Sequence, residues 1–332
     1  MSRYGAVVAT FTDLMIAAVE ESSRRDQREA DIEHLFLALI TTDYPAGHAL
    51  RRAGVSLEDA RQAVEDQHAH QLQLVGLDTG MPEPGRITAH ETTGHQLTRR
   101  TEEILYPTGD DEITYTSQVL RRLLEEPSGF ISEVLTRLKV SAAEILAELE
   151  QAVEVASPSV TATAQRGVLT GSSTTFVPAS AEEIWQPVSD AERMPEWDQT
   201  LRTVKNLSDD EGVWEAVVRE QLPNGERIKT KPKSQRRHIR RLLADEPHVI
   251  IWGISFPDAP QGNDLQHAIT LTPAEAGTQL EVIVRWIQPT SRLSLRSKVG
   301  RAIVGRPLRP VMRYFVRMQA AEFTRSISRH FR

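Results

Sequence analysis

Cysteine is absent from the sequence, so disulfide bonds and metal sites built on thiolates are excluded. The chain also lacks any apolar run of roughly 18 residues, the length that a membrane-spanning helix needs. Residues 1–10 carry neither the charged start nor the apolar core of a secretory signal peptide. These absences predict a cytoplasmic protein with no integral membrane segment.

Motifs for the common kinds of catalysis are missing as well. No Gly-x-Ser-x-Gly nucleophile motif occurs, and no acid/base pair stands out. The nearest approach to a phosphate-binding loop, residues 300–307, has arginine and proline where the loop needs lysine and a hydroxyl. His68, His70, His90 and His95 do not have the spacing of metal ligands. The sequence therefore predicts no metal and no cofactor, and favours a binding protein over an enzyme without settling that question.

Charge is distributed unevenly along the 332 residues, which are enough for two domains. Residues 1–166 carry 15 basic and 27 acidic side chains, whereas residues 167–332 carry 24 basic and 19 acidic ones. Two domains of different character are the simplest account of this difference. The acidic first half would be repelled by phosphates, so nucleic acid is not an expected partner.

The first half has the periodicity of packed helices. Residues 32–41 are apolar on nearly every side, which predicts a helix buried all round, with Asp31 as its N-cap. A helix is expected over residues 11–22, with Thr12 as its cap, and others over residues 46–53 and from a Ser56 cap to residue 67.

The same pattern returns further along the chain. Leu35 matches Val119, and Val55-Ser56 matches Val140-Ser141, at an offset of about 84 to 85 residues. This spacing predicts a duplicated four-helix unit, with repeats at about residues 8–70 and 90–153. The segment 71–86 between them contains three glycines and two prolines and is expected to be a loop.

These segments resemble the N-terminal domain of Clp-family unfoldases such as ClpC and ClpA. The residues that carry the resemblance are Phe11-Thr12-Asp13, Ile32-Glu33-His34-Leu35-Phe36-Leu37-Ala38-Leu39-Ile40 and Ala49-Leu50-Arg51-Arg52-Ala53-Gly54-Val55. The second repeat departs from the family, with Ser117-Gln118 in place of Glu-His. In this family the histidine at position 34 is structural, with its ring satisfied by a backbone group. No ATPase module of the unfoldases is expected in this sequence.

After residue 171 the apolar period changes from 3.6 to 2, which is typical of strands. The expected strands are residues 173–177, 201–207, 213–221, 237–243, 249–256, 265–272 and 279–287. Ser180 and Glu183 predict the start of a short helix, residues 223–226 a hairpin turn, and residues 308–331 a long final helix.

This second half resembles the START-like superfamily, the SRPBCC group that includes polyketide cyclases. The resemblance rests on Val177-Pro178-Ala179-Ser180-Ala181-Glu182-Glu183-Ile184-Trp185 and on Met194-Pro195-Glu196-Trp197. The whole chain is thus expected to be an all-α double Clp repeat followed by an α+β helix-grip domain, with a curved antiparallel sheet and a long C-terminal helix. The expected domains are residues 1–153 and 172–332, joined by a linker at 154–171.

The START-like resemblance implies a cavity for a hydrophobic ligand between sheet and helix. Candidate lining residues are Trp197, Trp214, Trp252, Trp286 and Tyr314, although for any single tryptophan core packing is favoured over a ligand contact. Asp264, His267 and Arg285 are candidates for a polar end of such a cavity, with a solvated strand face as the alternative.

The final helix is strongly basic. Residues 292–332 include 11 basic side chains and one acidic one. Val311, Tyr314, Phe315, Met318 and Ala321 have the spacing of a core-facing stripe, while Arg309, Arg313 and Arg317 share another face. The basic face could contact anionic lipid or the acidic first half, or it could simply be solvated.

Two hypotheses about function follow. In the first, the Clp repeat domain binds or sequesters protein substrates, adaptors or peptide-like ligands and modulates Clp proteolysis. The resemblance to ClpC implies phosphoarginine-marked proteins and cyclic-peptide antibiotics as ligand classes, with Clp protease components as possible partners. By position, the binding surface would include Val8, Phe11, Glu91 and Thr92. In the second, the START-like domain is a polyketide cyclase-like enzyme or a carrier of a lipid or aromatic small molecule.

Overall fold

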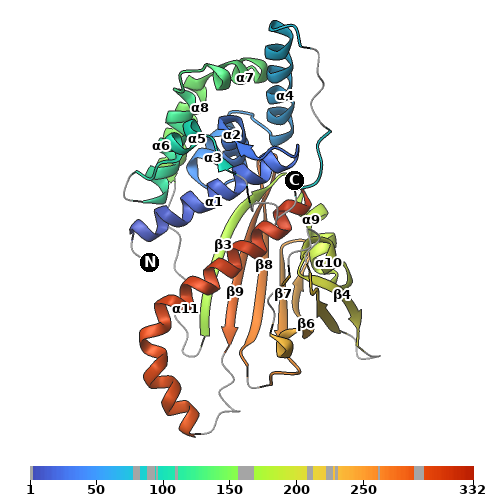
Figure 1. Cartoon of the computed structure of the whole chain (residues 1–332). Coiled ribbons are helices and arrows are strands. Elements are labelled where there is room, and N and C mark those ends of the chain that lie inside the picture. The colour runs from blue at the N-terminus through green and yellow to red at the C-terminus, as the bar shows by residue number, and fades with distance from the viewer. Residues whose placement is uncertain are drawn as a thin grey trace. The chain divides into compact units, whose positions relative to one another are not determined.

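The computed structural model describes residues 3–77, 83–87, 94, 96–108, 111–155, 168–207, 212–221, 227–228, 231–260, 262–287 and 295–332, without the side chains of residues 3–4 and 295–310. The chain divides into two compact units, Met1–Pro158 together with Arg332, and Ser159–Phe331, both drawn in Figure 1. Most of the expected linker, residues 156–167, lies outside the described residues.

The first unit is helical. Its described elements are α1 (Arg3–Ser23), β1 (Glu29–Ala30), α2 (Ile32–Ile40), α3 (Pro45–Arg52), α4 (Leu57–Leu74), β2 (Gln96–Leu97), α5 (Arg99–Leu105), α6 (Glu112–Leu124), α7 (Phe130–Leu138) and α8 (Ala142–Val155). Helices α7 and α8 begin 85 residues after α3 and α4, respectively. The helix spacing therefore recurs in the way that the sequence offset predicts.

Helix α2 forms the centre of this unit, and all nine of its residues are buried. The helix begins at Asp31, whose carboxylate accepts a hydrogen bond from the Ile32 N–H. The N–H of Asp31 donates to Nδ1 of His34 at 3.0 Å, which completes a capping box. The predicted all-round burial, the Asp31 cap and the structural role of His34 are confirmed.

Two local features differ from the expectation for this unit. Helix α1 begins at Arg3 rather than Phe11, and Thr12 lies inside it, where its hydroxyl donates to the Val8 carbonyl at 2.9 Å. The charged segment before α2 contains strand β1, which pairs in parallel with β2. This pairing joins segments more than sixty residues apart, so local periodicity gives no signal for it.

The second unit is a seven-stranded antiparallel sheet with helices. Its described elements are β3 (Val168–Val177), α9 (Ala181–Ser189), η1 (Ala191–Arg193), α10 (Met194–Trp197), β4 (Leu201–Asn206), β5 (Val213–Val218), η2 (Pro232–Ser234), β6 (Arg236–Asp245), β7 (Val249–Ser255), β8 (Asp264–Ala274), β9 (Gly277–Ile287) and α11 (Leu295–His330). The strand order is β3-β9-β8-β7-β6-β5-β4, so the first strand pairs with the last. Ser180 and Glu183 form the predicted capping box of α9.

Helix α11 packs against strands β3 and β9, as Figure 1 shows, and this is the arrangement of a helix-grip fold. Its buried residues include Val316, Ala320, Ala321, Thr324, Ile327 and Ser328. The approach to β3 is very close at Gly171, where a Cβ atom would lie 2.5 Å from the backbone nitrogen of Arg317. Only glycine fits at this position without displacing the helix.

The second unit differs from three expectations, which concern the start of β3, the start of α11 and the buried face of α11. Strand β3 begins at Val168, inside the expected linker, and α11 begins at Leu295 even though Pro307 and Pro310 each lack the N–H that a helix interior uses. Four of the five residues expected to form the core stripe of α11 are exposed, Val311, Tyr314, Phe315 and Met318, and only Ala321 is buried. Two apolar stripes with helical spacing run along this helix, and spacing alone does not tell which one meets the sheet. The predicted hairpin turn at 223–226 lies outside the described residues.

We expect Gly171→Val to destabilise the second unit by about 3 kcal/mol, because the added side chain would push α11 away from β3. Ser172→Val is the matched control, since this neighbouring side chain is exposed, and its effect should stay within about 0.5 kcal/mol. Urea denaturation followed by tryptophan fluorescence measures both, because all five tryptophans lie in this half of the sequence. Equal stability of the two variants would contradict the close helix–sheet contact.

Candidate functional site

The face of the sheet that meets α11 is lined by alternate residues of the strands. On β7 these are Ile250, Trp252 and Ile254, and on β8 they include Leu265 and Ile269. Together with the buried residues of α11 they form one apolar core. The interior of this unit therefore has the composition expected of a site for a hydrophobic molecule.

Tryptophans surround this interior and are held by hydrogen bonds. The indole of Trp197 donates to the Pro187 carbonyl at 2.9 Å, and that of Trp252 donates to the Val188 carbonyl at 3.0 Å. Trp286 donates to Oε1 of Gln319 on α11 at 2.7 Å. Each of these three indole N–H groups therefore has its hydrogen-bond partner within the chain, so only the apolar surface of each ring is left for packing.

The two remaining aromatic candidates differ in position. Trp214 is partly buried against the core and makes an edge-to-face contact with Trp252, with ring centroids 5.8 Å apart. Tyr314 is half exposed and contacts Phe315 on α11. The structure thus places the four tryptophans in or against the core and Tyr314 outside it.

His267 is the exception in this apolar interior. Its side chain is buried, and neither ring nitrogen has a hydrogen-bond partner among the described residues. Its ring packs edge-to-face on Phe323 of α11, with centroids 4.4 Å apart. Burial lowers the pKa of His267 to about 3, and the positive charge of Arg237 contributes to the shift. The imidazole is therefore neutral at physiological pH, with one donor and one acceptor unused.

Arg237 supplies a positive charge to the same region. Burial lowers the pKa of this guanidinium, and the negative charge of Asp198 opposes the shift. The Nε atom of Arg237 is buried and has no hydrogen-bond partner among the described residues. His267 and Arg237 thus present unused polar atoms within a largely apolar core, as does the buried hydroxyl of Ser328 on α11, and such atoms are uncommon in native proteins.

The structure separates the polar trio that the sequence suggested. Asp264 and His267 are three positions apart on β8 and therefore lie on opposite faces of the sheet. Arg285 pairs in register with Gln266 and lies on the outer face with Asp264. Only His267 enters the interior, where its charged neighbour is Arg237. Sequence analysis did not single out Arg237, although its place two residues before the buried Ile239 puts it on the same face.

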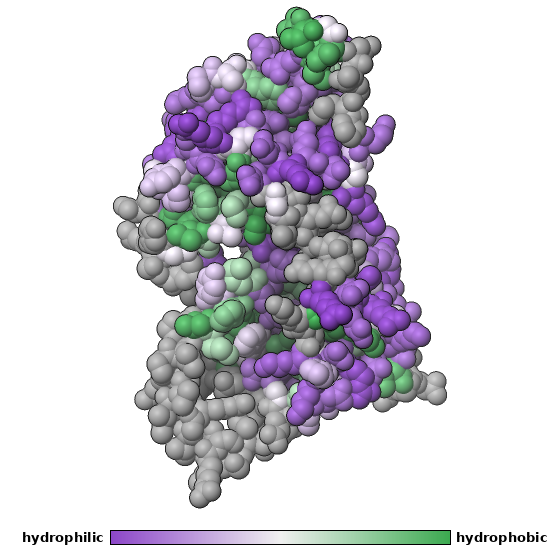
Figure 2. Space-filling view, in the orientation of Figure 1, coloured by the Kyte–Doolittle hydropathy of each residue, from purple (hydrophilic) through white to green (hydrophobic). Residues whose placement is uncertain are grey.

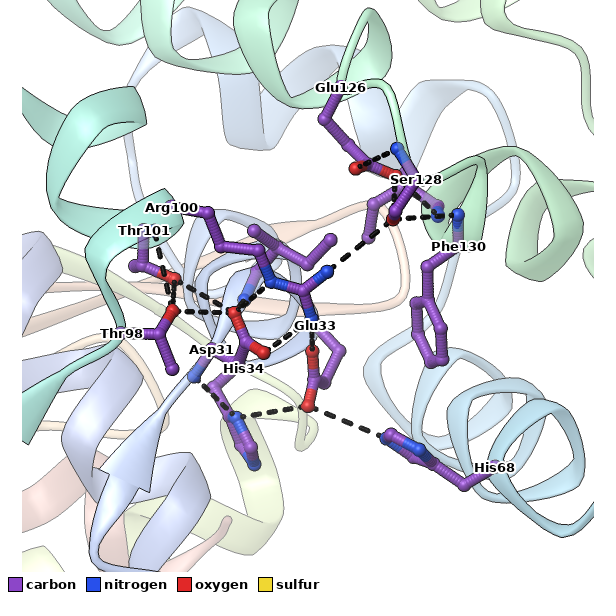
Figure 3. Close-up of polar contacts among 12 residues, drawn as sticks. Asp31, Glu33, His34, His68, Thr98, Arg100, Thr101, Glu126, Ser128 and Phe130 are labelled. Atoms are coloured by element: carbon purple, nitrogen blue, oxygen red, sulfur yellow. Dashed lines mark hydrogen bonds and ion pairs between the residues drawn. The ribbon is translucent and has the colours of Figure 1, made fainter. Parts of the chain in front are cut away.

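The first unit contains a polar network that joins the start of α2 to α5 and to the residues just before α7, shown in Figure 3. The Asp31 carboxylate, besides capping α2, accepts hydrogen bonds from the guanidinium of Arg100 on α5 and from the Thr98 hydroxyl. Arg100 also reaches the Ser128 hydroxyl at 3.4 Å. Burial opposes ionisation of Asp31, but these hydrogen bonds outweigh it and hold the pKa of the carboxyl below its usual range.

Two histidines border this network on the side of α2 and α4 (Figure 3). The Glu33 carboxylate lies 3.4 Å from Nε2 of His68 and 4.0 Å from the Arg100 guanidinium. The ring of His68 also packs on Phe130, with centroids 4.8 Å apart. Burial lowers the pKa of His34, which keeps this ring neutral and able to accept from the Asp31 N–H. Most polar groups here have partners within the chain, as expected of a structural connection.

The expected peptide-binding residues are placed as follows. Val8 lies on α1 with 39% of its surface exposed, and Phe11 packs partly buried against the helical core. Glu91 and Thr92 lie outside the described residues, as do His90 and His95. No group of three or more potential metal ligands occurs among the residues that the structure describes. Within the same residues, no helix is long and apolar enough to cross a membrane.

The two units match two protein families. The model of polyketide cyclases, dehydrases and lipid transport proteins matches residues 169–329, and that of the Clp repeat (R) N-terminal domain matches residues 9–90. The chain therefore carries a Clp repeat N-terminal domain and, after it, a polyketide cyclase-like domain of the START-like superfamily. No curated protein matches the chain.

Solved structures resemble the chain at low identity. The di-domain ARO/CYC StfQ from the steffimycin biosynthetic pathway is 15% identical, with 57% of this chain and 59% of that chain covered and a TM-score of 0.34. The polyketide cyclase-like protein Cgl2372 from Corynebacterium glutamicum is 15% identical, with 50% and 92% covered and a TM-score of 0.32. Because these sequence identities and TM-scores are low, neither protein supports the assignment of a functional residue in this chain.

We expect Asp31→Ala to destabilise the first unit by about 2 kcal/mol at neutral pH, because it removes a helix cap and the partner of a partly exposed arginine. Ser56→Ala removes the cap of α4 and an exposed hydrogen bond to the Asp59 carboxylate, and should cost about 1 kcal/mol. Because the pKa of Asp31 is lowered in the folded state, its contribution is complete above the usual Asp pKa of about 4 and is lost as the pH falls toward the lowered value.

Chemical denaturation followed by far-ultraviolet circular dichroism, at neutral and at acidic pH, measures this difference. The difference in free energy of unfolding between Asp31→Ala and the wild-type chain should decrease in acid, whereas the corresponding difference for Ser56→Ala should change little. A difference for Asp31→Ala that is independent of pH would show that the ionised carboxylate does not stabilise the fold.

Proposed function

We propose that the chain is a two-domain binding protein whose polyketide cyclase-like domain holds a hydrophobic small molecule between its sheet and α11. The observation that carries this proposal is His267, a buried imidazole with two unused nitrogens inside an apolar, tryptophan-lined interior. Leaving such a group without a partner costs about 1–3 kcal/mol. A ligand with one polar group would recover this energy by forming the missing hydrogen bond.

The state of His267 favours binding over acid–base catalysis. A general base works best when its pKa lies near the operating pH, whereas burial lowers the pKa of His267 to about 3. A neutral imidazole of this kind is suited to orient a ligand through a hydrogen bond rather than to accept a proton. A cyclase-like reaction remains the alternative function, and turnover of an aromatic polyketide substrate by the purified chain would support it instead.

For the Clp repeat domain we propose binding of protein or peptide ligands, which would allow the chain to modulate Clp proteolysis as a decoy or adaptor. The support is the family match over residues 9–90 and the exposure of Val8 on α1. Phosphoarginine is the smallest representative of the ligand classes that the family resemblance implies, and it serves as the probe.

We expect His267→Phe to weaken the binding of cis-parinaric acid, a fluorescent fatty acid, at least about tenfold, because the polar partner is lost. The same change should raise the stability of the ligand-free chain by about 1 kcal/mol, since it removes unpaired buried polar atoms. Fluorescence titration and urea denaturation measure the two effects.

The matched control is His238→Phe, on strand β6 of the same sheet but partly exposed, which should change neither property. Native mass spectrometry of the wild-type chain should reveal a co-purified hydrophobic molecule. If the wild-type chain carries no such molecule and binds no cis-parinaric acid, or if His267→Phe binds it as well as wild type, the proposed interior site is wrong.

For the first domain, we expect Val8→Asp to weaken phosphoarginine binding at least about fivefold, since it places a negative charge on the expected binding surface. Val153→Asp on α8 is the control, because Val153 has nearly the same exposure, 38% against 39% for Val8. Isothermal titration calorimetry of the full chain measures both. Equal affinities of the two variants, or no heat of binding to the wild-type chain, would contradict this role.

A further inference from the structure

Helix α11 presents an apolar stripe to solvent. Val311 lies three and four residues before the adjacent pair Tyr314 and Phe315, and Met318 lies four and three residues after them. The four side chains are 49%, 50%, 54% and 38% exposed. Figure 2 shows hydrophobic side chains gathered on this part of the helix, next to the residues drawn in grey. Large apolar side chains gathered in one exposed patch mark a surface that interacts with something.

This stripe is not a misplaced part of the core. The face of α11 that meets the sheet is already complete, with Val316, Ala320 and Ile327 fully buried. Val311 and Val316 are five positions apart, about 140° around a helix, so the exposed and buried stripes point in different directions. The exposed stripe therefore requires a partner outside the core of this domain.

Basic residues greatly outnumber acidic ones in the last part of the sequence, although Glu322 forms ion pairs with Arg325 and Arg329. From residue 292 to the end of the sequence there are 11 basic side chains and one acidic one. Arg313 is exposed within the stretch that carries the apolar stripe. A helix that combines a narrow apolar face containing aromatic rings with many arginines is typical of helices that lie in the interface of an anionic membrane.

We propose that this face of α11 docks on an anionic lipid surface. The apolar side chains of Val311, Tyr314, Phe315 and Met318 enter the boundary between headgroups and acyl chains, and the arginines neutralise lipid phosphates. The helix is 36 residues long, or about 54 Å, and so offers a row of contacts along the surface. The proposal does not depend on the interior ligand or on the Clp repeat domain.

The distribution of charge favours a membrane over a protein partner. Cations spread along about forty residues, with almost no acidic residue among them, match the diffuse field of an anionic bilayer. A protein interface normally pairs individual charges of both signs around a packed centre. The acidic first half of the chain and a second copy of α11 are the competing occupants, and the test distinguishes them.

The experiment is co-sedimentation of the full chain with phosphatidylcholine vesicles, with and without phosphatidylglycerol. Binding should require phosphatidylglycerol and weaken as the salt concentration rises from about 0.05 M to about 0.5 M. The double variant Tyr314→Ser, Phe315→Ser should weaken vesicle binding about tenfold or more. Because both rings are partly exposed, their removal leaves the core intact. Arg313→Glu should weaken vesicle binding as well and increase the amount of anionic lipid required.

Leu207→Ser is the matched control, because Leu207 is exposed to a similar degree, 42%, in the same domain. It should bind vesicles like the wild-type chain. Circular dichroism and thermal melts confirm that every variant is folded. Failure of the full chain to bind anionic vesicles, as expected if its own acidic half covers the stripe, would overturn the proposal.

Two further results would also overturn it. One is vesicle binding that is unchanged in the Tyr314→Ser, Phe315→Ser double variant. The other is a wild-type chain that binds no vesicles but forms a dimer, which the double variant does not form. Neither result would affect the interior site, whose test uses His267 and a soluble fatty acid.

Discussion

The close approach of α11 to strand β3 is the constraint on which the second domain depends. Because Gly171 lacks a side chain, the backbone of α11 at Val316 and Arg317 can lie directly on the strand. This contact fixes the rotation of the helix about its axis. That rotation directs Phe323 onto His267 and at the same time directs Tyr314 and Phe315 away from the sheet. The interior site and the exposed stripe are thus two consequences of one packing contact.

The buried polar groups of the two domains differ in whether they have hydrogen-bond partners within the chain. This difference distinguishes groups that stabilise the fold from groups that a ligand could use. In the Clp repeat domain, Asp31 bonds to backbone, hydroxyl and guanidinium donors, and His34 is satisfied by a backbone N–H. Such a network connects segments distant in sequence and needs no ligand. His267 is buried at least as deeply as His34 but has no polar partner among the described residues. A native fold retains an unpaired group of this kind at a cost in stability, and a bound molecule that completes its hydrogen bonds explains why.

Local patterns in the sequence predict the elements of this protein well. Capping residues such as Asp31, Ser56 and Ser180 begin the helices they were expected to begin, because the cap is an interaction between neighbours in the chain. The alternation of apolar residues locates the seven strands for a similar reason. The candidate site was predicted less completely. Strand alternation already separates Asp264 from His267, but the proximity of His267 to Arg237 depends on strands that are not adjacent in the sheet.

The sequence by itself determined which segments are helices and strands, which families the two halves resemble, and where charge and tryptophan concentrate. These properties follow from residue type and from the spacing of near neighbours. Only the tertiary structure decided which of the two apolar stripes of α11 is buried, that β1 pairs with β2, and that a single histidine stands unpaired in the interior. Each of these outcomes depends on contacts between residues far apart in the chain, and burial is a property of the assembled surfaces rather than of any one segment.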